Sequence, residues 1–315
     1  WARQRLKITL EDWQVFILAN IFGWVDAHTG LRRFLTVYLE VARKNAKSTL
    51  AAGIGLYMLA ADGEPGAEVY SAATTGDQAR IVFEVARQMV LREPDFIHNG
   101  IDPQRHGLYM PSDARKFEPL NAEGSTLDGL NPHCTIIDEL HAHKRRDVYD
   151  VLDTARGARD QSLLASITTA GSDRAGICYE QRTYVVKVLE GVFEDDRYFG
   201  VIYTLDDSDD WTDPAVWPKA NPNYGVSVLA IWRKGRAHRT GLQDMPLQFG
   251  DALLVYGQRR KLEALSRDPN FIVLDEAAAR AIVWWRRASA TATGCTGASP
   301  ISSWRRRTIS SIGRR

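Results

Sequence analysis

The residue types that could bind a nucleotide are concentrated in the segment 35–49. An apolar run with several β-branched residues ends in a short polar loop, which carries Lys47 and Ser48 where a helical pattern begins. This order of strand, polar loop and helix is typical of a phosphate-binding loop, in which N–H groups at the helix N-terminus hold an anion. Lys47 could reach the β- and γ-phosphates of a nucleotide, and the hydroxyl of Ser48 could ligate Mg²⁺.

The loop departs from the pattern GxxxxGK[ST] at both glycine positions, because Val41 occupies the first and Ala46 the second. A Cβ atom at position 46 restricts φ, so the loop should still form if Ala46 keeps a negative φ. A Lys-Ser pair after a strand is, on its own, as readily an ordinary strand–helix junction. The nucleotide interpretation therefore depends on the rest of the chain.

Two further apolar runs end in polar residues that could complete a phosphate site. Residues 134–139 predict a buried strand that ends in Asp138 and Glu139. In phosphate-loop NTPases the first such carboxylate holds the Mg²⁺ shell and a glutamate can polarise the attacking water. Residues 162–171 predict another strand, which ends in Thr168 and Thr169 before Gly171. An acidic pair alone could be a solvated strand end, so the order of the three motifs carries the interpretation.

Together these motifs resemble the ATPase half of the terminase large subunits of tailed bacteriophages, the motors that push DNA into a procapsid. The resemblance rests first on Arg-Lys-Asn-Ala-Lys-Ser at 43–48, Ile-Ile-Asp-Glu-Leu-His at 136–141 and Ile-Thr-Thr-Ala-Gly at 167–171. Segments 13–18, 71–79, 173–174 and 217–223 also fit. The similarity covers roughly residues 6–245.

The resemblance implies a role for each candidate residue. Arg43 would stabilise the γ-phosphate in cis, and Glu139 would orient or deprotonate the attacking water. Asp138 would hold Mg²⁺ together with the serine hydroxyl of the loop, while Thr168 and Thr169 would relay the hydrolysis state. The nucleotide-contacting set would be Gln14, against the adenine, with Lys44, Asn45, Ala46, Lys47, Ser48 and Thr49.

The same resemblance implies ligands, partners and a location. ATP and Mg²⁺ would be the cofactors, and double-stranded DNA would be bound mainly through its phosphates, hence in a salt-dependent way. The partners would be the terminase small subunit, the portal protein and further copies of the chain in a ring on the procapsid. The location would be the cytoplasm of the bacterial host, away from any membrane.

Apolar periodicity predicts an alternating α/β core. We expect helices over 10–21, 47–60, 76–92, 146–156 and 177–190, and strands over 34–41, 68–73, 134–138 and 162–168. Residues 93–132 should be irregular, with room for short strands, because Pro94, Pro103, Pro111 and Pro119 interrupt them. The alternation predicts a RecA-like fold, with a mainly parallel sheet covered by helices on both faces. Ligands should then bind at the carboxyl ends of the strands.

Three parts are predicted along the chain. Residues 1–205 would form the ATPase core and 206–262 a linker or small helical lobe, in which the basic residues between 233 and 239 could touch DNA or form a solvated face. Residues 263–315 would be a basic tail, disordered or truncated, because no acidic residue follows Glu276 while eight arginines do. A DNA-binding arm is the alternative for this tail, and the nuclease half of the family is not recognisable in it.

The composition agrees with an intracellular ATPase but does not distinguish it from other intracellular proteins. The chain has 315 residues, 44% of them hydrophobic, and a formal net charge of +1, so a basic DNA-binding surface would have to be local. Three cysteines without metal-type spacing suit a reducing compartment. No apolar run approaches the about 18–20 residues of a membrane span, and no signal peptide is recognisable.

Two other functions remain open from the sequence. The same core could serve a helicase-like DNA translocase outside packaging, although helicase-type arginine motifs of a second motor domain are not recognisable. The chain could also be an inactive remnant that binds partners without turnover. His141 and His143 could lie near the γ-phosphate or contact DNA, and a metal site built on them would need a third ligand.

Overall fold

Eight strands form the sheet that carries the candidate residues in the computed structural model. Six neighbouring strands are parallel, and two short strands continue one edge in antiparallel order. In spatial order they are β4 (Asp102–Pro103), β5 (Leu108–Met110), β6 (Arg115–Asn121), β3 (Glu68–Ala73), β7 (Cys134–Asp138), β8 (Leu163–Thr168), β2 (Thr36–Glu40) and β9 (Tyr198–Ile202). The structure describes residues 1–121, 129–144, 146–213, 215–222, 227–233, 236–238, 245, 252–256, 262 and 304–306.

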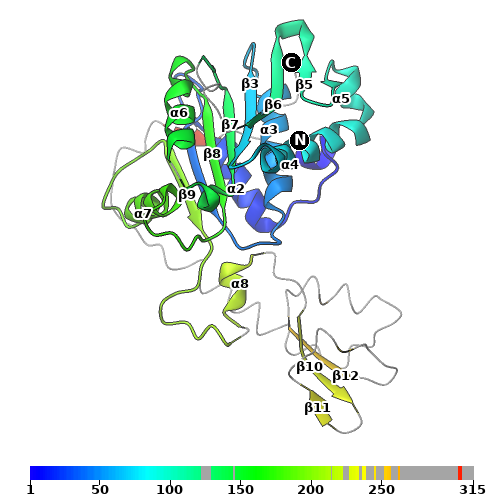
Figure 1. The fold of residues 1–315 in the computed structure, drawn as a ribbon, viewed down its shortest axis with the longest axis vertical. Helices are drawn as coiled ribbons and strands as arrows, with labels where there is room; N and C mark the ends of the chain where they lie inside the picture. Colours follow the sequence, from blue (N-terminus) through cyan, green and yellow to red (C-terminus); the bar gives the residue numbers. More distant parts are fainter. Residues whose placement is uncertain are drawn as a thin grey trace. The chain divides into compact units, whose positions relative to one another are not determined.

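Helices cover both faces of this sheet, as the sequence predicted (Figure 1). Along β2, Val37 and Leu39 join one apolar cluster, and Tyr38, which points to the opposite face, joins the other. The first cluster packs against α2 (Asp12–Gly23), α3 (Lys47–Ala60) and α4 (Gly76–Arg92). The second packs against α6 (Asp147–Ala155) and α7 (Ile177–Leu189). The two-sided burial explains the almost continuous apolar runs of the central strands.

Short elements complete this part of the chain. They are the helices α1 (Ala2–Arg5) and α5 (Pro94–His98), the 3₁₀ turns η1 (Pro111–Asp113), η2 (Leu140–Ala142) and η3 (Arg156–Ala158), and the strand β1 (Trp24–Asp26). The chain divides into two compact units, one of Trp1–Thr204 with Pro300–Arg315 and one of Leu205–Ser299. Among the described residues, no helix has both the length and the apolar character needed to cross a membrane.

The strands toward both edges of the sheet were not assigned individually from the sequence. Residues 93–132, expected to be irregular with room for short strands, contain β6, of which Lys116–Asn121 pair with β3 even though Pro119 lies among them. The antiparallel neighbour β5 pairs with β6 only as far as Phe117, so Pro119 lies where one side of the strand lacks a described partner and a missing N–H is tolerated. The edge strand β9 was not predicted, and it pairs in parallel with β2.

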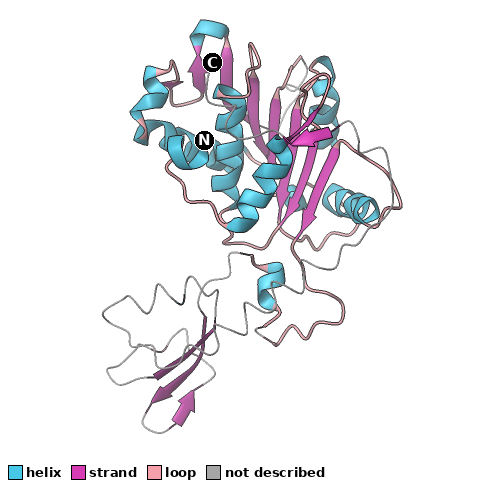
Figure 2. Cartoon of the chain, turned by 180° about the vertical axis from the view of Figure 1, so that it is seen from behind, coloured by secondary structure: helices cyan, strands magenta, loops and turns pink. Residues whose placement is uncertain are grey.

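For residues 206–262, predicted as a linker or small helical lobe, the helical prediction is wrong at three described segments, 227–233, 236–238 and 252–256, which are strands. The described residues of the second unit include the short helix α8 (Trp217–Ala220) and an antiparallel sheet in the order β11 (Arg236–His238), β10 (Ser227–Arg233) and β12 (Ala252–Tyr256). Figure 2 shows these strands in magenta. The runs Ser-Val-Leu-Ala-Ile-Trp-Arg and Ala-Leu-Leu-Val-Tyr are short and rich in β-branched and aromatic residues, which is typical of strands rather than helices.

The acidic and basic segments of the predicted lobe are partly described. The acidic loop 206–210 folds back on Lys219, whose Nζ lies 2.5 Å from Asp206 Oδ2 and 2.6 Å from Asp209 Oδ1. Of the basic cluster, Arg233 lies on β10, whereas Lys234 and Arg239 lie outside the described residues. Within the predicted tail 263–315, the structure describes only 304–306, as the strand β13 (Trp304–Arg306) antiparallel to β1. The other tail residues lie outside the described ranges.

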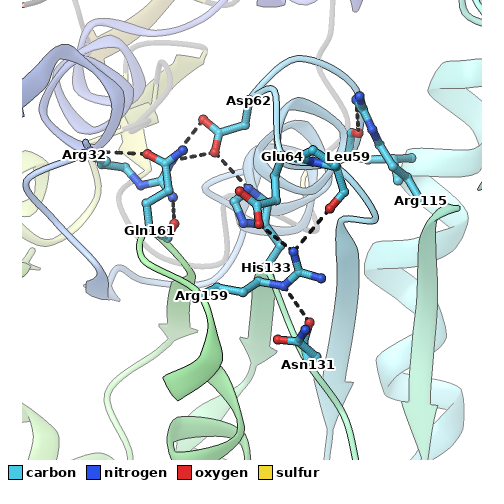
Figure 3. Close-up of polar contacts among 10 residues, drawn as sticks. Arg32, Leu59, Asp62, Glu64, Arg115, Asn131, His133, Arg159 and Gln161 are labelled. Carbon is cyan, nitrogen blue, oxygen red and sulfur yellow. Dashed lines mark hydrogen bonds and ion pairs between the residues drawn. The ribbon is translucent and has the colours of Figure 1, made fainter. Parts of the chain in front are cut away.

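A buried polar network joins the amino ends of the central strands (Figure 3). Arg32, which precedes β2, places Nη1 3.0 Å from both carboxylate oxygens of Asp62, and both side chains are 4% exposed. His133, which precedes β7, places Nε2 2.9 Å from Asp62 Oδ2. Arg159, which precedes β8, pairs with Glu64 at 2.6 Å. Removing one partner of a buried pair leaves an uncompensated charge, so this network fixes strand ends that are distant in sequence.

Candidate nucleotide-binding site

The loop between β2 and α3 has left-handed backbone at two positions. All five residues of β2 are buried, and the chain leaves the sheet at Val41 and enters α3 at Lys47. Lys44 has φ 68° and Ala46 has φ 54°. Ala46 therefore does not keep the negative φ that the sequence argument set as a condition for the loop. Left-handed residues within a turn allow successive N–H groups to converge into an anion-binding concavity, and Ala46 adopts this geometry without the glycine that would favour it.

Lys47 is buried and folds back over the loop. Its Nζ donates to the carbonyl of Val41 at 3.2 Å and to that of Ala42 at 3.4 Å. Burial lowers the pKa of Lys47, and the carboxylates of Glu139 and Asp138 oppose this shift. The two carboxylates therefore lie close enough to act on the lysine, although about 90 positions separate them in the sequence.

The remaining loop residues differ in exposure. Asn45 is 2% exposed, and its Nδ2 donates to the carbonyls of Ala42 at 2.9 Å and Arg43 at 3.2 Å, which closes the loop from inside. Arg43, Lys44 and Ala46 are exposed, and Ser48 and Thr49 are partly buried. The charge of Arg43 lowers the pKa of Lys47 further, so the guanidinium acts on the same region.

The acidic pair lies at the end of β7. Burial and the neighbouring Glu139 carboxylate raise the pKa of Asp138 to about 6, and Asp138 Oδ1 accepts from the backbone N–H of Glu139 at 3.0 Å. Glu139 has φ 51°, a left-handed conformation that is uncommon for a residue with a side chain. Its Oε2 is buried and lies 3.1 Å from Nδ1 of His141, with no hydrogen bond assigned to it within the described part of the chain.

The two threonines lie at the end of β8, between β7 and β2 in the sheet. Thr168 pairs in register with Glu40 of β2 and is fully buried. Its Oγ1 donates to the carbonyl of Thr169 at 2.9 Å and accepts from the backbone N–H of His141 at 3.0 Å. The side chain of His141 places Nδ1 3.3 Å from Thr169 Oγ1. A Cβ added at Gly171 would lie 2.9 Å from the Cβ of His141, so any larger residue there would force one of the two loops to shift.

Gln14 has a helix-capping contact in this structure. It lies in the first turn of α2, and its Oε1 accepts from the backbone N–H of Glu11 at 3.1 Å. The adjacent Trp13 packs edge-to-face on Tyr203, with 5.8 Å between ring centroids. The backbone N–H of Tyr203 donates to the carbonyl of Glu40 at 2.9 Å. These contacts connect the start of α2 to the carboxyl end of β2, from which the loop departs.

Sequence reasoning missed Glu40, a buried carboxylate one residue before the loop. It is 2% exposed, accepts from Tyr38 Oη at 2.8 Å and lies 3.3 Å from Arg182 Nε on α7. The available signal was an acidic residue in an otherwise apolar strand, which requires a buried partner. Among the described residues, no group of three or more His, Cys, Asp or Glu side chains is arranged to hold a metal ion, and His143 of the His-x-His pair is buried, which lowers its pKa.

Comparisons with known proteins identify relatives of this chain. The family model described as terminase large subunit, ATPase domain matches residues 12–187, more than half of the chain. Protein YmfN of Escherichia coli (strain K12) is 50% identical over 101 residues, which are 32% of this chain and 22% of that protein. The terminase large subunit of Enterobacteria phage HK97 is 34% identical over 146 residues, 44% of this chain and 28% of that protein. That of Lactococcus phage p2 is 26% identical over 193 residues, 60% of this chain and 35% of that protein.

A solved structure gives the same relationship in three dimensions. The crystal structure of the HK97 bacteriophage large terminase superimposes with a TM-score of 0.57 at 28% identity, over 68% of this chain and 43% of that chain. The chain thus spans about a fifth to a third of the curated relatives that it matches. The core, the three motifs and the extent of the family match agree, and the chain belongs to the family of terminase large subunit ATPase domains.

Proposed function

We propose that this chain is the Mg²⁺-dependent ATPase motor part of a DNA-packaging terminase large subunit. The observation that carries the proposal is the arrangement at one edge of the sheet. Lys47 interacts electrostatically with Asp138 and Glu139. Thr168 ends β8, which lies between β7, the strand that ends in Asp138, and β2, the strand that precedes the loop. A cationic lysine, two carboxylates and a hydroxyl at neighbouring strand ends suit phosphoryl transfer to water, which depends on positioning and electrostatics.

In the proposed mechanism, the loop binds the triphosphate of ATP. The N–H groups at the start of α3 and the left-handed turn before it offer donors to an anion. Lys47 now donates to two carbonyls of its own loop, and a phosphate would offer it stronger, charge-assisted hydrogen bonds. Arg43, exposed on the same loop, would stabilise charge on the γ-phosphoryl group. Gln14 would contact the adenine after releasing its capping contact.

The oxygen donors present fit a magnesium ion. Mg²⁺ prefers hard oxygen ligands and usually takes one or two from protein alongside phosphate oxygens and water. Asp138 and the Ser48 hydroxyl would supply them. The raised pKa of Asp138 reflects a buried negative charge without a full counterion, which a bound cation would compensate. When bound, the ion would neutralise charge on the phosphates.

Glu139 would orient the attacking water and accept its proton. A carboxylate has about four acceptor sites, so Glu139 can accept from a water molecule even with His141 Nδ1 3.1 Å from its Oε2. Thr168 and Thr169 would report the state of the γ-phosphate to β8 and to α7. Asp138 and Glu139 thus receive separate roles, metal binding and proton transfer.

Partners and location follow from the family. We propose that the ATPase drives double-stranded DNA into a procapsid, in a ring of copies of the chain with the terminase small subunit and the portal protein, in the bacterial cytoplasm. DNA contacts would be mainly to phosphates and would weaken as salt rises. We assign no nuclease activity to these residues.

The test is an ATPase assay of the purified chain with Mg²⁺, with and without double-stranded DNA. We expect hydrolysis by the wild-type chain, faster with DNA, and none by Lys47→Ala. Lys187→Ala, which removes an exposed lysine of α7, is the matched control and should retain activity. ATP binding without hydrolysis by the wild-type chain would support an inactive remnant, whereas unchanged turnover in Lys47→Ala would exclude this loop from the mechanism.

A further inference from the structure

His141 contacts both strand ends on which the proposed function depends. Its backbone N–H donates to Thr168 Oγ1 at 3.0 Å. Its ring nitrogen Nδ1 lies 3.2 Å from the same hydroxyl, 3.3 Å from Thr169 Oγ1 and 3.1 Å from Glu139 Oε2. One nitrogen atom is therefore within reach of three oxygens, two from β8 and the loop after it and one from the carboxylate that would act as the base.

The backbone around His141 holds the ring in this place. The 3₁₀ turn η2 begins after the left-handed Glu139 and is closed by the N–H of Ala142, which donates to the carbonyl of Glu139 at 2.8 Å. On the other side, Gly171 leaves no room for a Cβ beside the His141 Cβ. The side chain is 20% exposed. Its ring is thus enclosed by the two loops that carry the acidic and hydroxyl motifs.

We propose that His141 is a positioning residue for Glu139. With its proton on Nδ1, the ring can donate one good hydrogen bond at a time, and the Glu139 carboxylate competes with the two threonine hydroxyls for it. A movement of Thr168 or Thr169 toward a γ-phosphate would release the Nδ1–H to Glu139. His141 would then fix the carboxylate orientation only when nucleotide is present. This inference rests on the proposed function and gives it a physical link between the threonines and the base.

Two substitutions separate hydrogen bonding from packing. His141→Asn keeps a polar atom near the position of Nδ1 but loses most of the ring, whereas His141→Phe keeps a ring and loses the nitrogen. If the nitrogen positions Glu139, Phe should lower kcat about tenfold, the effect of one lost hydrogen bond, and Asn should recover most of it. The Kd for a fluorescent ATP analogue should stay unchanged in both. His98→Ala, on the exposed side of α5, is the control.

A double-mutant cycle tests whether His141 acts through Glu139. Glu139→Gln removes the base, so adding His141→Phe to it should cause no further loss in single-turnover hydrolysis, because the two changes disrupt one unit. Equal losses in both backgrounds would overturn the inference, as would full activity of His141→Phe or recovery by Phe rather than Asn. A wild-type chain that lacks ATPase activity would overturn the proposed function itself, and this inference with it.

Discussion

Ala46→Gly should stabilise the fold, because it relieves a left-handed alanine. The residue has φ 54° and ψ 34° and caps α3 without a side-chain hydrogen bond, and it is exposed, so removing its methyl group forfeits little packing. Left-handed backbone costs an L-residue about 1–2 kcal/mol. Glycine lowers the free energy of unfolding by roughly 0.5–1 kcal/mol, because it makes the unfolded chain more flexible. The net expectation is a gain of about 0.5–1 kcal/mol in the free energy of unfolding.

Urea denaturation of the wild-type chain and the variant measures this gain. For a unit of this size, it corresponds to a rise of about 1–4 °C in Tm. Two other alanines provide matched controls. Ala114 is exposed, has φ 56° and lies outside the candidate site, so Ala114→Gly should stabilise by a similar amount. Ala60 ends α3 in right-handed backbone, so Ala60→Gly should destabilise, by up to about 1 kcal/mol.

The pattern across the three variants decides the interpretation. Ala46→Gly should also leave ATP hydrolysis equal or higher, since glycine is the residue that the loop pattern GxxxxGK[ST] carries there. A loss of stability at Ala46 beside a gain at Ala114 would refute the left-handed geometry of the loop. A gain in stability with a large loss of ATPase activity would keep the geometry but show that the alanine methyl group is needed in the nucleotide complex.

Three further predictions concern the rest of the sheet. Glu139→Gln should leave ATP binding intact and lower hydrolysis roughly 10²-fold or more, because the base is lost; loss of binding instead would contradict the assigned role. Gly171→Ala should destabilise the chain, since its Cβ would lie 2.9 Å from that of His141, and an unchanged Tm would show that the two loops can separate. Asp62→Asn should destabilise by roughly 3–5 kcal/mol. Burial raises the pKa of the Asp62 carboxyl, but its partners lower it to a net value below 3.8, so the wild-type advantage should be complete above pH 3.8 and shrink as pH falls below it.

The central elements could be predicted from the sequence, several of them to the residue. The helices 47–60 and 76–92 and the strands 68–73 and 134–138 have the predicted bounds. Their apolar runs are long or strongly periodic, and two-sided burial makes the central strands almost continuously apolar. Because ligands bind at the carboxyl ends of parallel strands, the predicted strands also placed Lys47 and Asp138 on the same side of the sheet.

The edges were harder because edge strands need less apolar surface. Every residue of β9 is only partly buried, so its sequence lacks the continuous apolar run of a central strand. Pro119 in β6 and the short strands of the second unit were misinterpreted for a related reason, since local propensity does not show which neighbour a strand will have. The left-handed φ of Ala46 is a consequence of the loop that surrounds it, whereas the steric preference of a single alanine favours a negative φ.

The two ends of the parallel strands have different roles. Stabilising contacts lie at the amino ends, and the candidate site lies at the carboxyl ends. At the carboxyl edge, Ala46 and Glu139 have left-handed backbone and Asp138 has a raised pKa. Such features cost free energy and persist only where the surrounding structure over-determines them. At the amino edge, Arg32 and Asp62 form a buried pair (Figure 3) that fixes the same strands. Substitutions that weaken the amino edge should therefore loosen the nucleotide site without touching it, because β2 and β7 extend from one edge to the other.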